Sequence, residues 1–582
     1  MTDVRVAGRS SHHHQVRQLT LALLPGVAFL LVFTLRAAQT DSGWRFTLFD
    51  DALISMAYGR TLAQTGEWVW FPGADRVQGI TNPLWSFVMA GVHVINSSPA
   101  FAIPAITLIG SLLVLGTAVF GYASLLAAGG TRRAALAVAG LVPFLYPLTF
   151  WSLRGMEVGL LALLTSVLVF AALRIRAGTN TQARIWSAVA AAVALASVLT
   201  RLDALVGVVA IAAVASIASR TRRWRYWAIV AAVALLGAVL VTLFQGLYWG
   251  DLLPNTYHLK VEGVPLNERI TRGAFATAKA LPLTVLALVA WQMCRRHRED
   301  AIHRRACFLV TLCLAVVLSS TLYSVWTGGD AWEWSLFLNR TLSVALPIAL
   351  LGWMAASHVV SSVPRSSLIA LAVSGVGLGM STNPNTFDLR IGLIGLALTT
   401  AASALVGWAG TTGRSTTPRV ILLGIGFVLA TSAPGALLWV TNSGLNVVED
   451  QQFAARADQL KAVTDPKARI AVMWAGAPGY FSERTTIDMF GKSDRVIARG
   501  EPSVDPETGE PFPFIPGHNK WNYEYSIEAQ RPDVVFQLGP DRSEAQILVE
   551  AWGYVPRCLD DGWRSYFRAD SELIRWEQLR DC

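Results

Sequence analysis

Apolar runs of membrane-spanning length alternate with short basic segments along most of the chain. The first run extends from Leu19 to Leu35 and follows a basic N-terminus that contains Arg5, Arg9 and Arg17. A helix needs ~20 apolar residues to cross a bilayer, and most of the later runs approach that length. The pattern therefore predicts a polytopic α-helical membrane protein.

We expect about 13 transmembrane helices from the number of such runs. They cover Leu19–Leu35, Phe101–Leu126, Ala134–Phe150, Val158–Leu173, Trp186–Leu199, Ala204–Ile217, Trp227–Leu247, Ala274–Met293, Cys307–Val325, Leu338–Ser357, Leu368–Met380, Ile391–Gly407 and Val420–Val440. Basic residues collect at every second connection, which is typical of cytoplasmic loops. An odd number of spans then places the C-terminus outside.

This orientation divides the chain into three parts. Residues 1–18 form a cytoplasmic N-terminus, residues 19–440 a transmembrane domain, and residues 441–582 a soluble domain on the outer face. The first outer loop covers about residues 36–99, and its apolar segment Leu84–Ile95 is too short to span easily. We interpret that segment as a surface helix, because a span there would place Arg132 and Arg133 outside.

Composition supports the membrane class. Hydrophobic residues make up 53% of the 582 residues and charged residues only 15%, which excludes an ordinary soluble enzyme. The formal net charge of +9 does not indicate a nucleic-acid partner, because many of the arginines lie in short loops between apolar runs. We therefore expect the lipid bilayer as a partner and no nucleic acid.

The soluble domain has a different pattern. Short β-like runs, such as Arg469–Trp474 and Asp533–Leu538, alternate with polar, helix-compatible stretches, which predicts an α/β domain. Cys558 and Cys582 both lie in it, and an oxidising outer compartment would permit a disulfide between them.

Two adjacent carboxylates, Asp50 and Asp51, begin an amphipathic stretch in the first outer loop. The spacing predicts a short helix that lies along the membrane interface. Carboxylates there are costly unless a sugar hydroxyl, a metal ion or a basic partner uses them. The alternative is an ordinary helix N-terminus, where Asp is favoured by capping and by the helix dipole.

Further polar and aromatic side chains fall on the same outer face. The candidates are Asn82, Trp85, Glu157, Arg201, Asn255, His258, Lys260, Asp330 and Arg340. Aromatic rings interleaved with hydrogen-bonding groups suit a sugar, whereas an aromatic interface belt would explain the rings but not the acids. For Arg201, we favour a structural ion pair with Asp203.

Several of these segments together resemble the GT-C membrane glycosyltransferases. The matching segments are Asp50–Tyr58, Gly79–Trp85, Gly155–Glu157, Gly250–Thr256 with Lys260, and Gly328–Asp330. The soluble tail is similar to those of actinobacterial members, which include arabinofuranosyltransferases and mannosyltransferases. Gln78 departs from the pattern, because an acid is expected before the Gly-x-Thr-Asn turn.

The resemblance implies a transferase that moves a sugar from a polyprenyl-phosphate carrier to an acceptor outside the cytoplasmic membrane. It favours Asp50 as general base, with Asp51 and Glu157 orienting the acceptor or holding a divalent cation such as Mg²⁺, Mn²⁺ or Ca²⁺. Lys260, Arg340 and Arg201 are candidates for the carrier phosphate. Candidates for substrate contact are Asn82, Trp85, Asn255, His258, Asp330, His518 and Trp521.

Arabinofuranose is the favoured sugar and a cell-envelope glycan the favoured acceptor. The alternatives are a mannosyltransferase or other hexosyltransferase acting on a glycolipid or protein, and a membrane transporter or flippase. A transporter should carry its ionisable residues in mid-membrane. For His518 and Trp521, the alternative to acceptor binding is a small aromatic core in the soluble domain.

Overall fold

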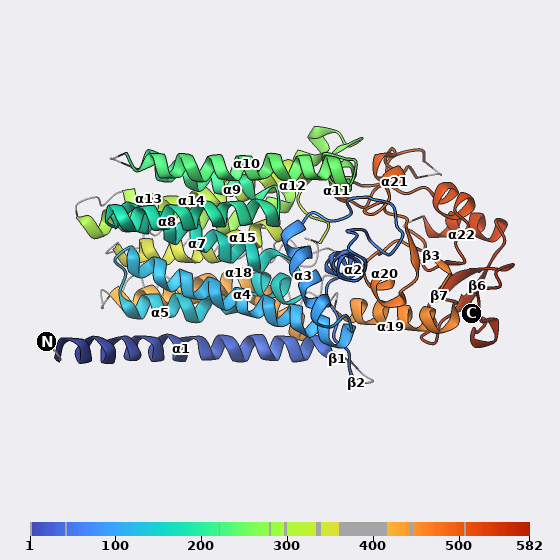
Figure 1. Ribbon diagram of the computed structural model, residues 1–582, viewed down its shortest axis with the longest axis horizontal. Helices are drawn as coiled ribbons and strands as arrows, with labels where there is room; N and C mark the ends of the chain where they lie inside the picture. Colours follow the sequence, from blue (N-terminus) through green and yellow to red (C-terminus); the bar gives the residue numbers. More distant parts are fainter. Residues whose placement is uncertain are drawn as a thin grey trace.

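The chain divides into a bundle of long helices and a smaller α/β domain that caps one end of the bundle (Figure 1). The computed structural model describes residues 3–40, 43–219, 222–278, 281–295, 300–332, 339–359, 416–441, 447–505, 508–539 and 541–582. The N-terminus lies at the end of the bundle far from the α/β domain, and the C-terminus lies in that domain.

Seven helices in these residues are long and apolar enough to cross a membrane, or eight if one bent pair forms a single span. The seven spans lie in α1 (Asp3–Ala38), α4 (Pro99–Ala127), α7 (Val158–Ala177), α8 (Asn180–Thr200), α10 (Trp224–Tyr248), α14 (Ala301–Thr327) and α15 (Arg340–Val359). Each overlaps a span predicted from the sequence. The chain is a multi-pass membrane protein.

Proline breaks one predicted span. Ala134–Phe150 corresponds to α5 (Arg132–Leu141), η1 (Val142–Phe144) and α6 (Tyr146–Leu153), and the two halves are bent by 54°. Pro143 and Pro147 cause the break, because a proline has no N–H to continue the hydrogen-bond ladder.

The predicted number of about 13 helices is not confirmed. Ala274–Met293 divides between α12 (Leu266–Ala278) and α13 (Leu281–Arg295), and α9 (Ala204–Ile217) has only 14 residues. Val420–Val440 lies within α18 (Thr416–Thr441). The predicted spans Leu368–Met380 and Ile391–Gly407 lie outside the described residues.

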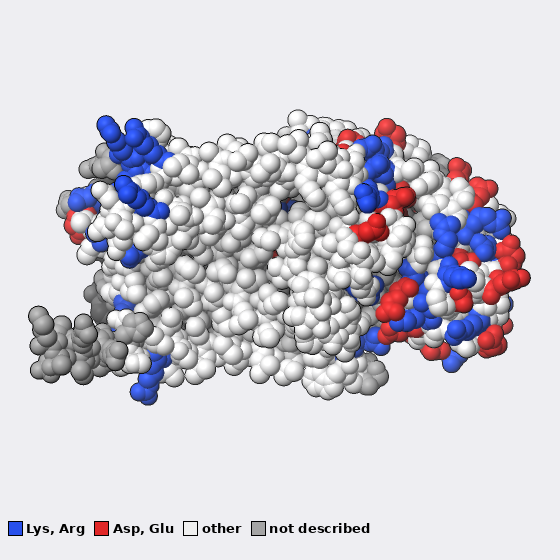
Figure 2. Space-filling view, in the orientation of Figure 1, with Lys and Arg blue, Asp and Glu red and all other residues white. Residues whose placement is uncertain are grey.

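Charge is concentrated at the two ends of the molecule (Figure 2). The end near the N-terminus shows mostly Lys and Arg, the middle is almost free of charge on this face, and the α/β domain carries both signs. Apolar side chains are exposed along the middle helices, for example Leu108 on α4 and Leu240 on α10. This distribution fits a bundle surrounded by lipid.

The segment between α1 and α4 contains β1 (Gln39–Thr40), β2 (Gly43–Trp44), α2 (Asp50–Thr65) and α3 (Pro83–Ile95). Two helices were predicted here, but α2 does not lie on an open interface. Its residues Leu53, Met56 and Tyr58 are all buried, because α3 packs on one side and the α/β domain covers another. The amphipathic surface-helix prediction for α2 is therefore wrong.

The α/β domain contains a five-stranded sheet in the order β4-β3-β5-β7-β6. Strands β3 (Arg469–Val472), β4 (Thr485–Asp488) and β5 (Val534–Val535) are parallel, and β7 (Arg564–Arg568) runs antiparallel to β5 and to β6 (Tyr554–Cys558). Its helical segments are α19 (Val447–Val463), α20 (Ala477–Ser482), α21 (Arg495–Arg499), η3 (Glu524–Ala529), α22 (Arg542–Ala551) and η4 (Trp576–Gln578). The predicted α/β domain is confirmed.

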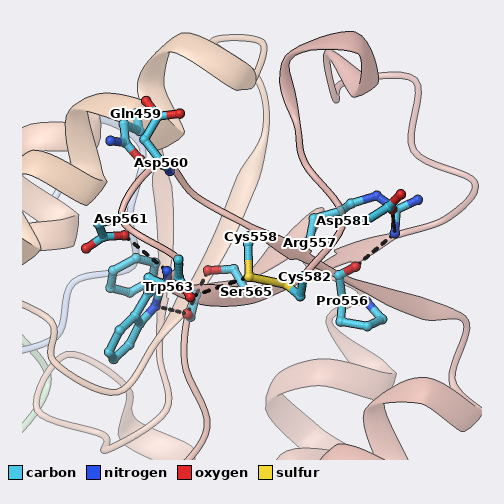
Figure 3. The surroundings of a disulfide bond; sticks show 12 residues. Gln459, Pro556, Arg557, Cys558, Asp560, Asp561, Trp563, Ser565, Asp581 and Cys582 are labelled. Atoms are coloured by element: carbon cyan, nitrogen blue, oxygen red, sulfur yellow. Dashed lines mark hydrogen bonds and ion pairs between the residues drawn. A yellow bond between two sulfur atoms is a disulfide. The ribbon is translucent and has the colours of Figure 1, made fainter.

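A disulfide joins Cys558 at the end of β6 to the C-terminal Cys582, across 24 residues of sequence (Figure 3). The backbone N–H of Cys558 also donates to the carbonyl oxygen of Arg580 at 3.0 Å, and Arg557 forms an ion pair with Asp581. The final segment is thus tied to the edge of the sheet.

Candidate active site

A cavity of about 230 Å³ lies where the helical bundle meets the α/β domain. Its walls come from α2, the turn before α3, α11 (Asn255–Val261), the start of α15 and two loops of the α/β domain. Four cations line it: Arg201, Lys260, Arg340 and Lys492. Asp51, Asn82, Asp330 and His518 line it as well.

The two adjacent aspartates face different surroundings. Asp50 does not line this cavity; its carboxylate accepts hydrogen bonds from the backbone N–H groups of Gly476 (3.1 Å) and Ala477 (2.8 Å). Burial nevertheless raises the pKa of Asp50 to about 6. Adjacent residues on a helix point in directions ~100° apart, which explains why only Asp51 reaches the cavity.

Asp51 is held by cations from both domains. Arg340 Nη1 lies 3.0 Å from Asp51 Oδ2, and Lys492 Nζ pairs with Oδ1. Burial alone would raise the pKa of Asp51, but Lys492 and Arg340 outweigh it and hold that pKa well below the ordinary value. Asp51 is thus a carboxylate in the cavity wall, whereas the sequence resemblance favoured Asp50 for that position.

A tight turn places Lys492 at the cavity. Asp488, the last residue of β4, accepts hydrogen bonds from the backbone N–H groups of Phe490 (3.0 Å), Gly491 (3.1 Å) and Ser493 (2.7 Å). Gly491 adopts a φ of +78°, which a residue with a Cβ would rarely adopt. Lys492 was not among the residues predicted from the sequence, although a turn at the carboxyl end of a parallel strand is a frequent ligand site.

Arg340 also binds a second carboxylate. Its Nε lies 2.7 Å from Asp330 Oδ2 and its Nη2 lies 2.9 Å from Asp330 Oδ1, so the pair is bidentate. Asp330 follows Gly328 and Gly329, both at a φ of +80°, which turn the chain at the end of α14. The sequence predicted both residues for the site, and the structure brings them together.

Lys260 stands apart from the other three cations. Within the described part of the chain, no acceptor forms a hydrogen bond or ion pair with its ammonium group. Burial lowers the pKa of Lys260 to about 8; the charge of Asp330 opposes the shift, and those of Arg340 and Arg201 add to it. A partly buried lysine in a cavity wall is available to an anionic ligand.

Arg201 connects the cavity wall to the buried Glu157. Arg201 binds Glu157 Oε1 (2.8 Å) and Asp203 Oδ2 (2.6 Å), and Asn82 Nδ2 donates to Glu157 Oε2 at 2.9 Å. The ion pair between Arg201 and Asp203 matches the favoured structural interpretation. Glu157 is almost fully buried and ties α7 to the turn before α3.

Four predicted substrate-contact residues do not line the cavity: Trp85, Asn255, His258 and Trp521. Trp85 Nε1 donates to the Gly155 carbonyl at 2.8 Å, and Asn255 Nδ2 donates to the Gly491 carbonyl at 3.2 Å. His258 Nε2 lies 3.3 Å from Asp251, and Trp521 Nε1 donates to Asp541 at 3.0 Å. These side chains support the walls rather than face the cavity.

The site does not fit the divalent cation that was expected at Asp51 and Glu157. Both oxygens of Asp51 contact cationic side chains, and those of Glu157 contact Arg201 and Asn82. Among the residues that the structure describes, no group of three or more His, Cys, Asp or Glu side chains could hold a metal ion.

Comparison with known proteins identifies the fold of the bundle. The structure is similar to that of ArnT from Cupriavidus metallidurans bound to undecaprenyl phosphate, with a TM-score of 0.56, 15% identity, and coverage of 95% of this chain and 98% of ArnT. ArnT from the same organism in the apo state gives a TM-score of 0.55, 16% identity, and coverage of 94% and 97%. The chain has the GT-C fold.

The sequence comparisons add less. Residues 443–574 match a family model described as a domain of unknown function, DUF8728. This match covers the α/β domain, within the predicted bounds 441–582. No curated protein matches the chain.

Proposed function

We propose that the protein is a glycosyltransferase that moves a sugar from a polyprenyl-phosphate carrier to a cell-envelope glycan. The observation that carries this proposal is a cavity in which Asp51 faces the cations Arg340 and Lys492, with Lys260, which has no partner among the described residues, in the same wall. A carboxylate and an available cation are what deprotonation of a hydroxyl and binding of a phosphate require.

A second cavity supports a lipid-linked donor. It measures about 70 Å³, lies among α7, α8, α9, α14 and α15, and is lined mainly by apolar side chains such as Leu161, Val208 and Val316. The two cavities share a wall: Arg201, Asp203, Tyr323, Arg340 and Thr341 line both. A carrier with its phosphate in the charged cavity could place its isoprenoid chain in the apolar one, and ArnT has been seen bound to undecaprenyl phosphate.

Asp51 is the proposed general base. The acceptor hydroxyl oxygen attacks the anomeric carbon of the donor while the bond from that carbon to the phosphate oxygen breaks. The hydroxyl proton passes to Asp51, and the polyprenyl phosphate leaves with its negative charge stabilised by Lys260. The donor phosphate also gives Arg340 and Lys492 another anion to bind, which would weaken their hold on Asp51 and raise its basicity.

We place the site on the outer face of the cytoplasmic membrane. The end of the bundle far from the α/β domain shows mostly Lys and Arg, and the positive-inside rule assigns such an end to the cytoplasm (Figure 2). Arabinofuranose as the sugar and a wall polysaccharide as the acceptor follow from the sequence resemblance, with mannose or another hexose as the second choice.

Transfer by the purified protein tests this function. We expect label from polyprenyl-phosphate arabinofuranose, or failing that from polyprenyl-phosphate mannose, to appear in a cell-wall glycan acceptor. Each transfer should release one sugar-free polyprenyl phosphate. Movement of intact carrier across a vesicle membrane without release of polyprenyl phosphate would contradict the proposal and indicate a flippase.

The pH profile tests the role of Lys260. Because burial lowers the pKa of Lys260 to about 8, its charge is present below that pH and is lost as the pH rises through it. We expect kcat/KM for the donor to fall by ~10-fold per pH unit above the pKa, since this ratio reports the free enzyme. Lys260→Arg should move the alkaline limb beyond the measured range, because arginine keeps its charge. The same alkaline limb in both proteins would remove Lys260 from the phosphate site.

A further inference from the structure

Three uncharged polar side chains in the wall of the larger cavity have buried atoms that find no hydrogen-bond partner among the residues that the structure describes. These side chains are Gln78, Gln245 and His518. Gln78 is only 2% exposed and both of its amide atoms lack a partner; Gln245 is 1% exposed and its Oε1 lacks one. Buried polar atoms are normally paired, so these three side chains around one cavity indicate a place where a ligand binds.

The tautomer of His518 defines what that ligand must offer. Its Nδ1 lies 3.2 Å from the carbonyl oxygen of Pro516, which can only accept, so Nδ1 carries the proton. Burial and the nearby Lys492 lower the pKa of His518 to about 3, which keeps the ring neutral at physiological pH. Its Nε2 is therefore a pure acceptor and needs a donor such as a hydroxyl; an ionised phosphate oxygen cannot supply one.

The three residues lie in segments that adjoin the one carrying Lys260. The backbone N–H of Asn255, at the start of α11, donates to the carbonyl oxygen of Gln78 at 3.2 Å. On the other side, the space beside Gly517 is occupied by Lys260, whose Cε would lie 3.6 Å from a Cβ built there. Gln245 lies in the last turns of α10, shortly before α11.

We propose that Gln78, Gln245 and His518 form a neutral subsite that binds the hydroxyl groups of the donor's sugar. This inference rests on the proposed function, because it assumes that Lys260 binds the donor phosphate. A sugar attached to that phosphate would lie next to the neutral subsite. Sugar hydroxyls both donate and accept, which matches two amides and one bare imidazole nitrogen.

Binding of two lipids that differ only in the sugar tests the neutral subsite. Gln78→Leu and Gln245→Leu remove the hydrogen-bonding atoms while keeping much of the side-chain volume. We expect each variant to bind polyprenyl-phosphate arabinofuranose ~3–10-fold more weakly than the wild type, with affinity for sugar-free polyprenyl phosphate changed by less than ~2-fold. Gln546→Leu on the exposed face of α22 is the matched control and should alter neither affinity.

Melting temperature supplies an independent readout. Because the amide atoms concerned are buried and unpaired without a ligand, Leu at Gln78 or Gln245 should leave the melting temperature of the unliganded protein unchanged or raise it. A clear fall in melting temperature would show that the amides form structural hydrogen bonds and would overturn the proposal. The proposal would also fail if a variant bound both lipids more weakly by the same factor, or bound both as tightly as the wild type does. If the wild type bound neither lipid, the proposed function itself would fail, and the neutral subsite with it.

Discussion

Asp51→Asn should reduce sugar transfer by ~10²–10⁴-fold, the range expected when a general base is lost. Of the two adjacent aspartates, Asp51 is the one that lines the cavity, and its oxygens face Arg340 and Lys492. Asparagine has nearly the same shape but cannot take a proton from a hydroxyl. The measurement is single-turnover transfer from saturating donor, so that a change in donor affinity does not hide the chemical step.

Asp50→Asn is the informative comparison. Both oxygens of Asp50 accept backbone hydrogen bonds from Gly476 and Ala477, and an amide would turn an NH₂ group toward one of those N–H donors. We therefore expect Asp50→Asn to lower the melting temperature, with transfer reduced through weaker docking of the α/β domain. If Asp50→Asn stopped the chemistry in a stable protein while Asp51→Asn remained active, the assignment of the base would be reversed.

The long spans could be predicted because their signal is local. Runs such as Trp227–Leu247 and Cys307–Val325 appear as α10 (Trp224–Tyr248) and α14 (Ala301–Thr327), with ends shifted by a few residues. Each run is apolar over its whole length, so neighbouring helices have little influence on whether it forms a helix. Where prolines interrupt the pattern, as at Pro143, hydropathy alone did not show the break.

The membrane half of the site could also be predicted. Asp51, Asn82, Lys260, Asp330 and Arg340 come from separate segments, which the positive-inside rule predicted to lie on one face. The structure shows that they line one cavity. A predicted position on the same membrane face could not distinguish these lining residues from Trp85 and His258, which support the walls without lining the cavity.

The contribution of the α/β domain could not be predicted in the same way. Lys492 pairs with Asp51 across 441 residues of sequence, and no hydrophobic periodicity records such a contact. The burial of α2 could not be predicted for the same reason. The sequence shows the apolar residues of α2, but it does not show that the α/β domain covers another face of this helix. His518 was selected because its loop is polar and aromatic, and Trp521 in the same loop packs into the core of the domain instead.

Docking of the α/β domain on α2 depends on a close approach at Gly476. A Cβ built on Gly476 would overlap the backbone oxygen of Asp50, and it would also lie 2.8 Å from the Asp50 carboxyl carbon. The backbone N–H groups of Gly476 and Ala477 reach the Asp50 carboxylate only because the two backbones approach this closely. Loop residues after β3 thus set the distance between the two domains.

Gly476→Ala should therefore reduce transfer by ~10²-fold, because a displacement of about 1 Å can cost that much when reacting groups must be aligned. The added methyl group must push the α/β domain away from α2, which moves Lys492 and His518 relative to Asp51. Overpacking of this kind also costs about 1–3 kcal/mol, so the melting temperature should fall. Since Lys260 belongs to the helical bundle, the donor KM should change less than kcat.

Gly500→Ala is the matched control in the same domain. Its φ of −67° suits alanine, and the atoms nearest to an added Cβ are the carbonyl oxygens of Ile497 (3.3 Å) and Val496 (3.5 Å), which belong to the preceding helix α21 and not to α2. Transfer and melting temperature should stay near the wild-type values in that variant. If Gly476→Ala behaved like Gly500→Ala, close docking would be unnecessary for catalysis, and Lys492 would not act on Asp51. A loss confined to Gly476→Ala, with kcat affected more than the donor KM, would instead assign the α/β domain a positioning role in the active site.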